Sequence, residues 1–268
     1  MPIGQRLMGG DMVIRFDSLS ECASVVKGMH PFLYAMDGGE NYGYLTHAKA
    51  LQTCIEGDNS FVAPAEKLMD KLDASIEVST ASWQPSMNGA YPVVPEFLAG
   101  TPTCMRQRVH EETECAPIAI YVGVACSSAI SAEQMRNRGT AILALLMKLQ
   151  VIRPIELYIV EESGGKEDCF SVVRIESKPL NLSTAGFALC HVGFVRHVLY
   201  TVANNKVGFT GQWPMMYKSE GYEAYLRSEL GMKDNDLFVK AAYIGDPLLK
   251  DPIAWVNAQV ERFTKREE

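Results

Sequence analysis

The pattern of hydrophobic and polar positions predicts alternating buried strands and amphipathic helices in the second half of the chain. Residues 117–126 form a nearly continuous apolar run, typical of a strand buried on both faces. A helix is predicted over 132–149, because Ser131 opens a capping box and apolar residues then recur at helical spacing. Pro154 ends that helix, and 155–160 form the next apolar strand. This βαβ unit predicts a parallel sheet.

The same alternation continues to the end of the chain. Strands are predicted at 170–176 and 237–244, and helices at 187–204, at 219–230 and from Asp251 onward. Residues 116–268 are therefore predicted to form an α/β domain with a mainly parallel sheet in a Rossmann-type three-layer arrangement.

The first part of the chain lacks this regularity. Residues 1–12 contain several glycines and no periodic pattern, so we expect a mobile N-terminus. Residues 13–115 are predicted to form a helical and irregular region packed on the α/β core. Short helices are predicted at 18–28, 46–55 and 64–72. Prolines and glycines interrupt 76–110, which favours short strands or an ordered loop, with an edge strand at 104–109.

Composition narrows the protein class without identifying a function. The 268 residues are 47% hydrophobic and 21% charged, an ordinary globular composition. No apolar run is long enough to span a membrane, and the N-terminus has no apolar signal segment, so we expect a cytoplasmic protein. The 7 cysteines are scattered without a CxxC pair, which indicates reduced thiols rather than a zinc site or disulfides.

The charge is unevenly distributed. The net charge of −7 argues against a protein that coats nucleic acid through its overall charge. Between Glu176 and Glu220, however, the sequence contains no acidic residue. The charged residues of that segment are Lys178, Arg196, Lys206 and Lys218.

Aromatic residues occur among these cations. Rings that stack on bases, beside cations that contact phosphates, are what a single-stranded nucleic-acid surface needs. The alternative is that the aromatics of the predicted helix belong to the core, whereas those of the loop 204–218 are better placed for exposure. The candidate nucleic-acid-binding residues are Lys178, Arg196, His197, Lys206, Phe209, Trp213, Tyr217 and Lys218. A second candidate patch consists of Trp83, Tyr91, Arg106 and Arg108.

The loop after the first predicted strand is where an open α/β sheet would bind a ligand. It contains neither the glycine pattern of a dinucleotide site nor a P-loop or a GxSxG nucleophile motif, so no cofactor is expected. Ser127, Ser128 and Cys126 would each need a histidine partner, and nothing in the spacing supplies one. The serines are better explained as caps of the following helix. A non-enzymatic protein is therefore predicted, and a hydrolase using Ser127 or Ser128 is the weakest alternative.

The predicted topology is also that of a von Willebrand factor A domain, in which a DxSxS motif in this loop binds a divalent metal through oxygen ligands. At that spacing the chain has Val124, Cys126 and Ser128, so the carboxylate is missing. We therefore predict a degenerate site without metal.

Several N-terminal motifs resemble a bacteriophage protein family. They are Trp83, Gly89-Ala-Tyr-Pro-Val-Val94 and a Gly-x-Pro-x-Cys-Met element at 100–105, followed by the strand, serines and helix of 118–149. The resemblance covers about residues 14–160. In that family such elements precede a degenerate von Willebrand A-like domain, and it includes single-stranded DNA-binding transcription cofactors of enquatrovirus-type podophages.

The resemblance implies a transcription cofactor in the host cytoplasm. Such a protein would bind single-stranded DNA and recruit a phage RNA polymerase to middle promoters, with other phage or host proteins as further partners and no membrane. The alternative is a protein–protein adaptor or host-factor inhibitor that does not bind DNA, which the acidic net charge fits equally well.

Overall fold

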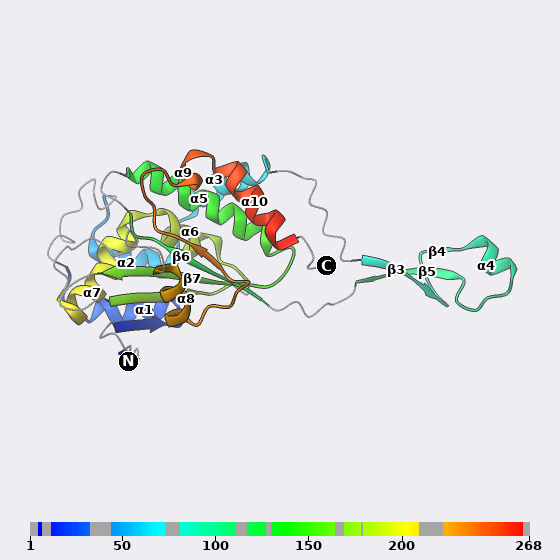
Figure 1. Ribbon diagram of the computed structural model, residues 1–268, viewed down its shortest axis with the longest axis horizontal. Helices are drawn as coiled ribbons and strands as arrows, with labels where there is room; N and C mark the ends of the chain where they lie inside the picture. Colours follow the sequence, from blue (N-terminus) through cyan, green and yellow to red (C-terminus); the bar gives the residue numbers. More distant parts are fainter. Residues whose placement is uncertain are drawn as a thin grey trace. The chain divides into compact units, whose positions relative to one another are not determined.

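The computed structural model shows a mixed α/β protein (Figure 1). It describes residues 5–6, 12–32, 44–72, 81–110, 117–126, 130–163, 169–177, 179–208 and 222–264. The chain divides into two compact units. We call Met1–Leu72 together with Pro117–Glu268 the main unit, and Asp73–Ala116 the inserted unit.

The main unit contains a sheet and the helices that cover it. Its described strands are β1 (Gln5–Arg6), β2 (Met12–Phe16), β6 (Ile118–Gly123), β7 (Ile155–Ser163), β8 (Cys169–Ile175) and β9 (Leu237–Val239). Its described helices are α1 (Leu19–Lys27), α2 (His47–Glu56), η3 (Asn59–Phe61), α3 (Val62–Met69), α5 (Ala132–Leu149), α6 (Leu182–Cys190), η4 (Phe194–Leu199), α7 (Tyr200–Val207), α8 (Tyr222–Leu230), α9 (Pro247–Lys250) and α10 (Pro252–Thr264).

The strands form one mainly parallel sheet, as the sequence predicts. Among the described residues the strand order is β1-β2-β8-β7-β6-β9. β6 pairs in parallel with both β7 and β9, and β2 pairs in parallel with β8. β7 and β8 are antiparallel, and so are the short β1 and β2. The predicted α/β class of this part of the chain is therefore confirmed.

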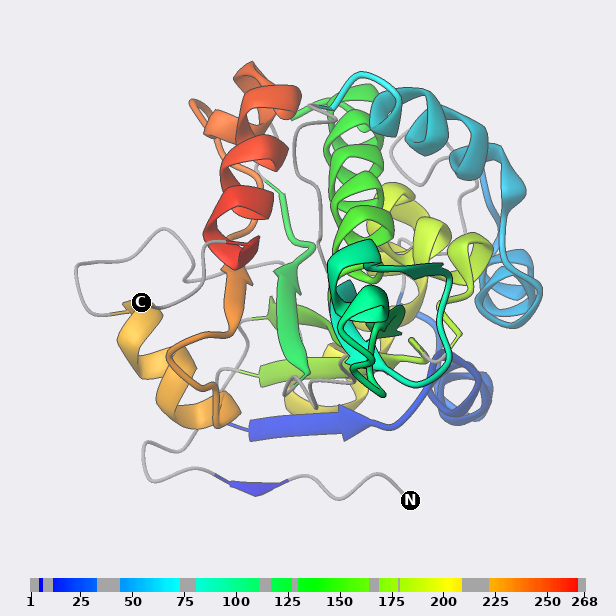
Figure 2. The same ribbon diagram turned by 90° about the vertical axis from the view of Figure 1, so that its right-hand side faces the viewer.

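Both faces of the sheet are buried. Strand side chains alternate between the two faces, and buried residues occupy both sets of positions. On one face, Leu226 and Leu230 of α8 pack against Val13, Tyr121, Val160, Phe170 and Val172. The alternate positions Ile14, Ile120, Leu157, Ile159 and Val173 are also buried. α1 and α7 pack against β8, α6 packs on α5, and α10 lies beside α5 (Figures 1 and 2).

α5 is the central helix of the main unit and has the bounds that the sequence predicts. Ser131 and Gln134 form the expected capping box at its N-terminus. Gly139 lets α5 approach α6 closely, since a Cβ atom there would lie 2.6 Å from the Cys190 sulfur and collide with the Leu189 backbone. Residues Ala141–Leu146 of this helix are all buried.

The predicted single helix over 187–204 is wrong in its bounds and continuity. α6 begins earlier, where the Asn181 side chain accepts hydrogen bonds from the amides of Ser183 and Thr184. The helix stops at His191, and a π-helix, η4, and then α7 follow. The apolar pattern therefore identified the buried segment but not the break within it.

The N-terminal boundaries also differ from the prediction. Gln5 and Arg6 pair with β2, and Met12 already belongs to β2, so the described part of the first twelve residues is not a free end. Residues Met1–Leu72 belong to the same compact unit as the α/β region. A single N-terminal region at 13–115 is therefore corrected to two parts that belong to different units.

The inserted unit is a small antiparallel sheet. Its described elements are β3 (Ala81–Ser86), β4 (Tyr91–Pro92), α4 (Val94–Leu98) and β5 (Met105–His110), in the strand order β3-β5-β4. Short strands were predicted here, but β5 is the middle strand rather than an edge. Gly89 is required beside β5, because a Cβ atom would collide with the backbone of Arg106.

Candidate functional site

The carboxyl end of β6 lies where an open α/β sheet usually binds its ligand. There the Val124 amide donates to the Val160 carbonyl at 3.1 Å, and Cys126 forms a parallel bridge with Ala242. Val124 is buried. The apolar side chain that stands in place of a metal-binding carboxylate is thus part of the core.

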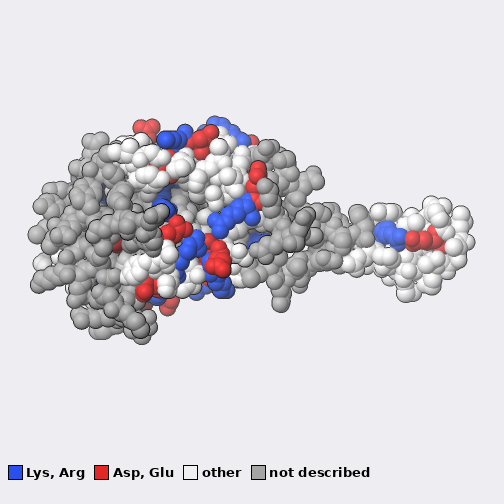
Figure 3. Space-filling model, viewed as in Figure 1, with Lys and Arg blue, Asp and Glu red and all other residues white. Residues whose placement is uncertain are grey.

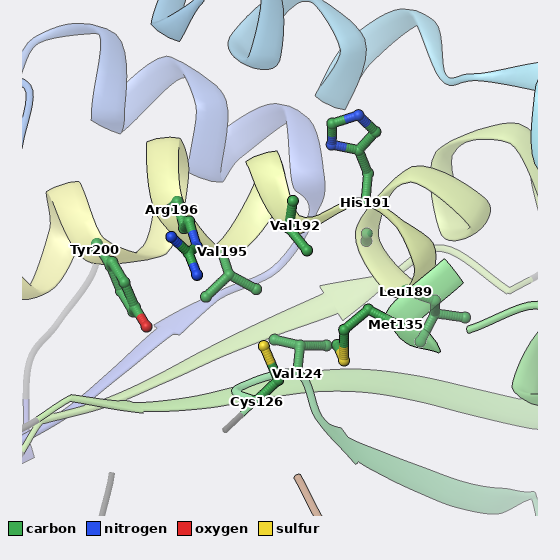
Figure 4. Close-up of a pocket in the computed structure, with 10 residues that line it drawn as sticks. Val124, Cys126, Met135, Leu189, His191, Val192, Val195, Arg196 and Tyr200 are labelled. Atoms are coloured by element: carbon green, nitrogen blue, oxygen red, sulfur yellow. The ribbon is translucent and has the colours of Figure 1, made fainter. Parts of the chain in front are cut away.

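A small hollow adjoins this strand end (Figure 4). Val124 and Cys126 line it together with Met135 of α5. Residues of α6, of the break between α6 and η4, of η4 and of α7 complete it: Ala188, Leu189, His191, Val192, Val195, Arg196 and Tyr200. Its volume of about 10 Å³ holds no more than about one water molecule. The hollow is too small for a substrate or nucleotide.

The Cys126 thiol lies at the edge of this hollow. Burial raises its pKa above the usual 9.0, while the Arg196 and Arg138 guanidinium groups act in the opposite direction. The thiol is therefore protonated at neutral pH, and a protonated thiol is a poor nucleophile. Ser127 and Ser128 lie outside the described residues, so the structure does not bear on the hydrolase alternative that uses them.

Metal binding finds no support in the described residues, where no group of three or more His, Cys, Asp or Glu side chains could hold an ion. Of the three positions that correspond to a DxSxS motif, Val124 and Cys126 are described and Ser128 is not. The two described positions offer no oxygen ligand.

A buried charge pair connects the elements around this edge. Arg138 of α5 is fully buried, and its Nε lies 3.6 Å from the Asp246 Oδ2. The same guanidinium donates to the Lys240 carbonyl, and Asp246 caps α9 through the Leu248 amide at 3.0 Å. Arg138 thereby fixes α5 against the segment that follows β9.

A second buried polar cluster lies at the end of β7, and the sequence analysis did not identify it. The Ser163 hydroxyl lies 2.7 Å from both oxygens of Glu161. Burial raises the pKa of Glu161 to about 8, and burial and then Glu161 raise the pKa of Cys169 to about 12. A polar Glu-Glu-Ser sequence directly after an apolar strand was the available signal.

The acid-free segment places only some of its candidate residues on the surface. Lys206 is exposed on α7, and Arg196 is half-buried in the hollow described above. Phe187 and Phe194 are buried in the core, and Tyr200 packs edge-on against Phe32 at a ring distance of 6.0 Å. Lys178, Phe209, Trp213, Tyr217 and Lys218 lie outside the described residues.

His197 is a correction to the predicted DNA surface. Its side chain is fully buried in η4, with the His47 ring 6.2 Å away. It lies three residues after Phe194 and four before Thr201, on the same buried helical face. A phosphate or base has no access to this imidazole in the folded protein.

The second candidate patch lies in the inserted unit. Strand pairing places Tyr91 opposite Arg106 and Trp83 opposite Arg108, but the side chains of Trp83 and Arg108 are not described. Arg106 forms a bidentate ion pair with Glu96, at 2.5 and 3.0 Å. Because Glu96 neutralises it, Arg106 is a poor phosphate contact, whereas Tyr91 is exposed.

A polar hollow of about 120 Å³ lies at the opposite end of the sheet, after β2 and β8. Its polar lining includes Ser18, Ser20, Asn181, Thr184 and the carboxylate of Glu176. Ser18 and Asn181 are occupied as helix N-caps. The hollow is large enough for several waters, and the Glu176 carboxylate disfavours an anion there.

The fold defines a mixed α/β protein. At the carboxyl end of β6, the described residues do not form a recognisable set of catalytic side chains. The chain belongs to the family described as "Domain of unknown function (DUF7192)", whose model matches residues 9–266. No curated protein and no solved structure matches the chain.

Within the described residues, no single helix is long and apolar enough to cross a membrane. α6 and residues Phe194–Val207 pass that test only as a pair, and they are bent by 79° at the break between them.

Proposed function

We propose that this protein is a phage transcription cofactor that binds single-stranded DNA and recruits a phage RNA polymerase to middle promoters in the host cytoplasm. The motifs at Trp83, Gly89–Val94 and Gly100–Met105 support this, because they resemble the phage family described above. The mainly parallel sheet and the helix after β6 support a von Willebrand A-like core without a functional metal site.

The observation that carries the DNA-binding part is the acid-free segment from Ser177 to Ser219. Its described part forms α6, η4 and α7, where Lys206 is exposed on a surface that receives no carboxylate from its own segment. A nucleic-acid phosphate binds more readily to such a surface than to one that also carries acidic side chains, because carboxylates repel phosphates.

Fluorescence anisotropy of a labelled single-stranded oligonucleotide across a salt series tests this function. Lys206→Ala is expected to weaken binding and to reduce the slope of log affinity against log salt by about one, the loss of one phosphate contact. Lys250→Ala is the matched control, because it removes another exposed lysine, which belongs to α9 and lies outside the acid-free segment. Equal slopes in both variants would exclude this surface.

Base stacking has a different signature in the same assay. Trp213→Ala is expected to weaken binding by roughly 1–3 kcal/mol without changing the salt slope, since a stacked ring releases no counterion. A thermal melt of the variant distinguishes lost stacking from lost folding. Early melting with intact DNA binding of the folded fraction would assign Trp213 to the core.

The second candidate function is a protein–protein adaptor or host-factor inhibitor that does not bind DNA. The burial of His197 and the partial burial of Arg196 favour it, because they leave Lys206 as the exposed cation among the described candidates of the acid-free segment. Absence of oligonucleotide binding by the wild-type protein at physiological salt would select this function.

A further inference from the structure

The inserted unit has an unusual distribution of apolar side chains. From Gln84 to Gln107, where side chains are described, no residue is buried. Five large hydrophobic residues are exposed there, namely Met87, Tyr91, Val94, Phe97 and Leu98. A sheet of this size normally needs a buried face or a covering partner for stability.

α4 concentrates this apolar surface. Val94, Phe97 and Leu98 occupy positions i, i+3 and i+4, so they share one side of the helix, with 61%, 63% and 79% of each residue exposed. Glu96 of the same helix is engaged by Arg106 of β5. The ion pair therefore fixes the charged side of α4 to the sheet, and the apolar side is left exposed by the side chains described from Gln84 to Gln107.

The surface is also almost without charge. Between residues 81 and 105 the only charged residue is Glu96, and Arg106 neutralises it. On the face seen in Figure 3, the described atoms of the unit that carries α4 are white except for one group of adjacent blue and red atoms. Apolar anchors at i, i+3 and i+4 are the pattern by which a helix enters an apolar groove of another protein.

Neither hollow described above in the main unit is such a groove. The hollow at β6 measures about 10 Å³, and the hollow of about 120 Å³ has a polar lining of hydroxyl, amide and carboxylate groups. The first hollow is too small for a phenylalanine ring and the second is lined mainly by polar groups, so neither suits an apolar anchor from a second copy of the chain. The net charge of −7 opposes approach to an anionic lipid surface.

We propose that the α4 surface, defined as Met87, Tyr91, Val94, Phe97 and Leu98, inserts into an uncharged apolar groove of a different protein. The inference rests on the proposed function only because both the cofactor and the adaptor require a protein partner. It assigns partner binding to the inserted unit, separately from the acid-free segment of the main unit.

A photo-crosslinking amino acid in place of Leu98, in the full chain within infected host cells, tests which molecule covers this surface. We expect a crosslink to a protein of different sequence. Crosslinks only to this chain, only to phospholipid, or to nothing would overturn the proposal, since each contradicts a groove on another protein.

Binding to the purified crosslinked protein then measures the contribution of the surface. Leu98→Asp and Phe97→Asp are each expected to raise the dissociation constant at least about tenfold, as for a central anchor of an interface. Val151→Asp is the matched control, because it places the same charge on a 73% exposed apolar residue of the main unit. Equal weakening by the control, or no weakening by either α4 variant, would overturn the proposal.

The same variants separate this inference from the proposed function. Leu98→Asp is expected to leave oligonucleotide binding unchanged, since Leu98 belongs neither to the acid-free segment nor to the second candidate patch. A crosslinked partner other than an RNA polymerase would remove the proposed recruitment of polymerase and keep the docking surface. Polymerase binding that is unaffected by both α4 variants would remove the docking surface and keep the proposed recruitment of polymerase.

Discussion

The two units use hydrophobic residues in opposite ways. In the main unit they lie on both faces of a sheet and along helices such as α5, where they are buried. In the inserted unit no side chain described from Gln84 to Gln107 is buried, five large hydrophobic residues are exposed, and a bidentate ion pair connects its helix to its sheet. Apolar composition therefore does not by itself predict a core. It accompanies a buried core in the main unit and, as we propose, a binding surface in the inserted unit.

The largest expected difference concerns the ion pairs of the two units. Arg138→Met leaves the buried Asp246 carboxylate without the Arg138 guanidinium, and removing one partner of a buried pair costs roughly 3–5 kcal/mol of unfolding free energy. Arg106→Met affects a pair that is partly exposed to solvent and is expected to destabilise the protein less. Urea denaturation of both variants checks the contrast. Similar losses of unfolding free energy in the two variants would mean that the difference in burial does not separate the two ion pairs.

Truncation of leucine provides the next comparison. Leu145 of α5 is fully buried, and Leu145→Ala is expected to cost about 2–5 kcal/mol because it removes packed methyl groups and leaves a cavity. Leu98→Ala removes the same atoms from an exposed position and is expected to change stability by less than about 0.5 kcal/mol. A large loss on Leu98→Ala in the isolated protein would show that the α4 surface is already covered.

Protonation of Glu161 adds a pH dependence to the main unit. Burial raises the pKa of this carboxyl from 4.5 to about 8, so between these values the folded protein keeps a proton that the unfolded chain has released. Its contribution to stability is complete below the unfolded pKa and is lost as the pH rises through the folded pKa. The expected loss is roughly 1.4 kcal/mol per pH unit within that window. Urea denaturation at several pH values should show a weaker dependence for Glu161→Gln. Parallel curves for the two proteins would contradict the assignment.

The smallest expected effect is that of divalent metal. Because Val124 and Cys126 stand where oxygen ligands would be required, millimolar magnesium or calcium is expected to leave the melting temperature unchanged. Differential scanning calorimetry with and without metal measures this. A rise of several degrees would place a metal site elsewhere in the chain.

Local signals allowed much of the main unit to be predicted. The capping box of Ser131 and Gln134 located the start of α5, and the apolar run at 117–126 located β6. Both are properties of adjacent residues, so they need no knowledge of the tertiary fold. In contrast, β2 was missed because five residues give a weak pattern and its partner β8 is distant in the sequence.

The sequence predicted the exposure of candidate residues only where their side chains are not packed into the core. Net charge along the sequence identified Lys206 but could not separate it from His197, which lies on the apolar side of its helix. The reverse occurred in the inserted unit, where an apolar composition did not indicate that Phe97 and Leu98 are exposed. Both differences depend on packing, which the local sequence does not contain.

The pairing of β2 with β8 has a consequence for synthesis of the protein on the ribosome. Residues 12–16 emerge early, but their parallel partner β8 begins only at Cys169, after the entire inserted unit. The sheet of the main unit is therefore not expected to fold vectorially from its N-terminus, because before the ribosome has made β8 the described neighbour of β2 is the two-residue strand β1. In the interval the apolar residues Val13, Ile14 and Phe16 remain available to chaperones, and a fragment that ends before β8 should fail to fold.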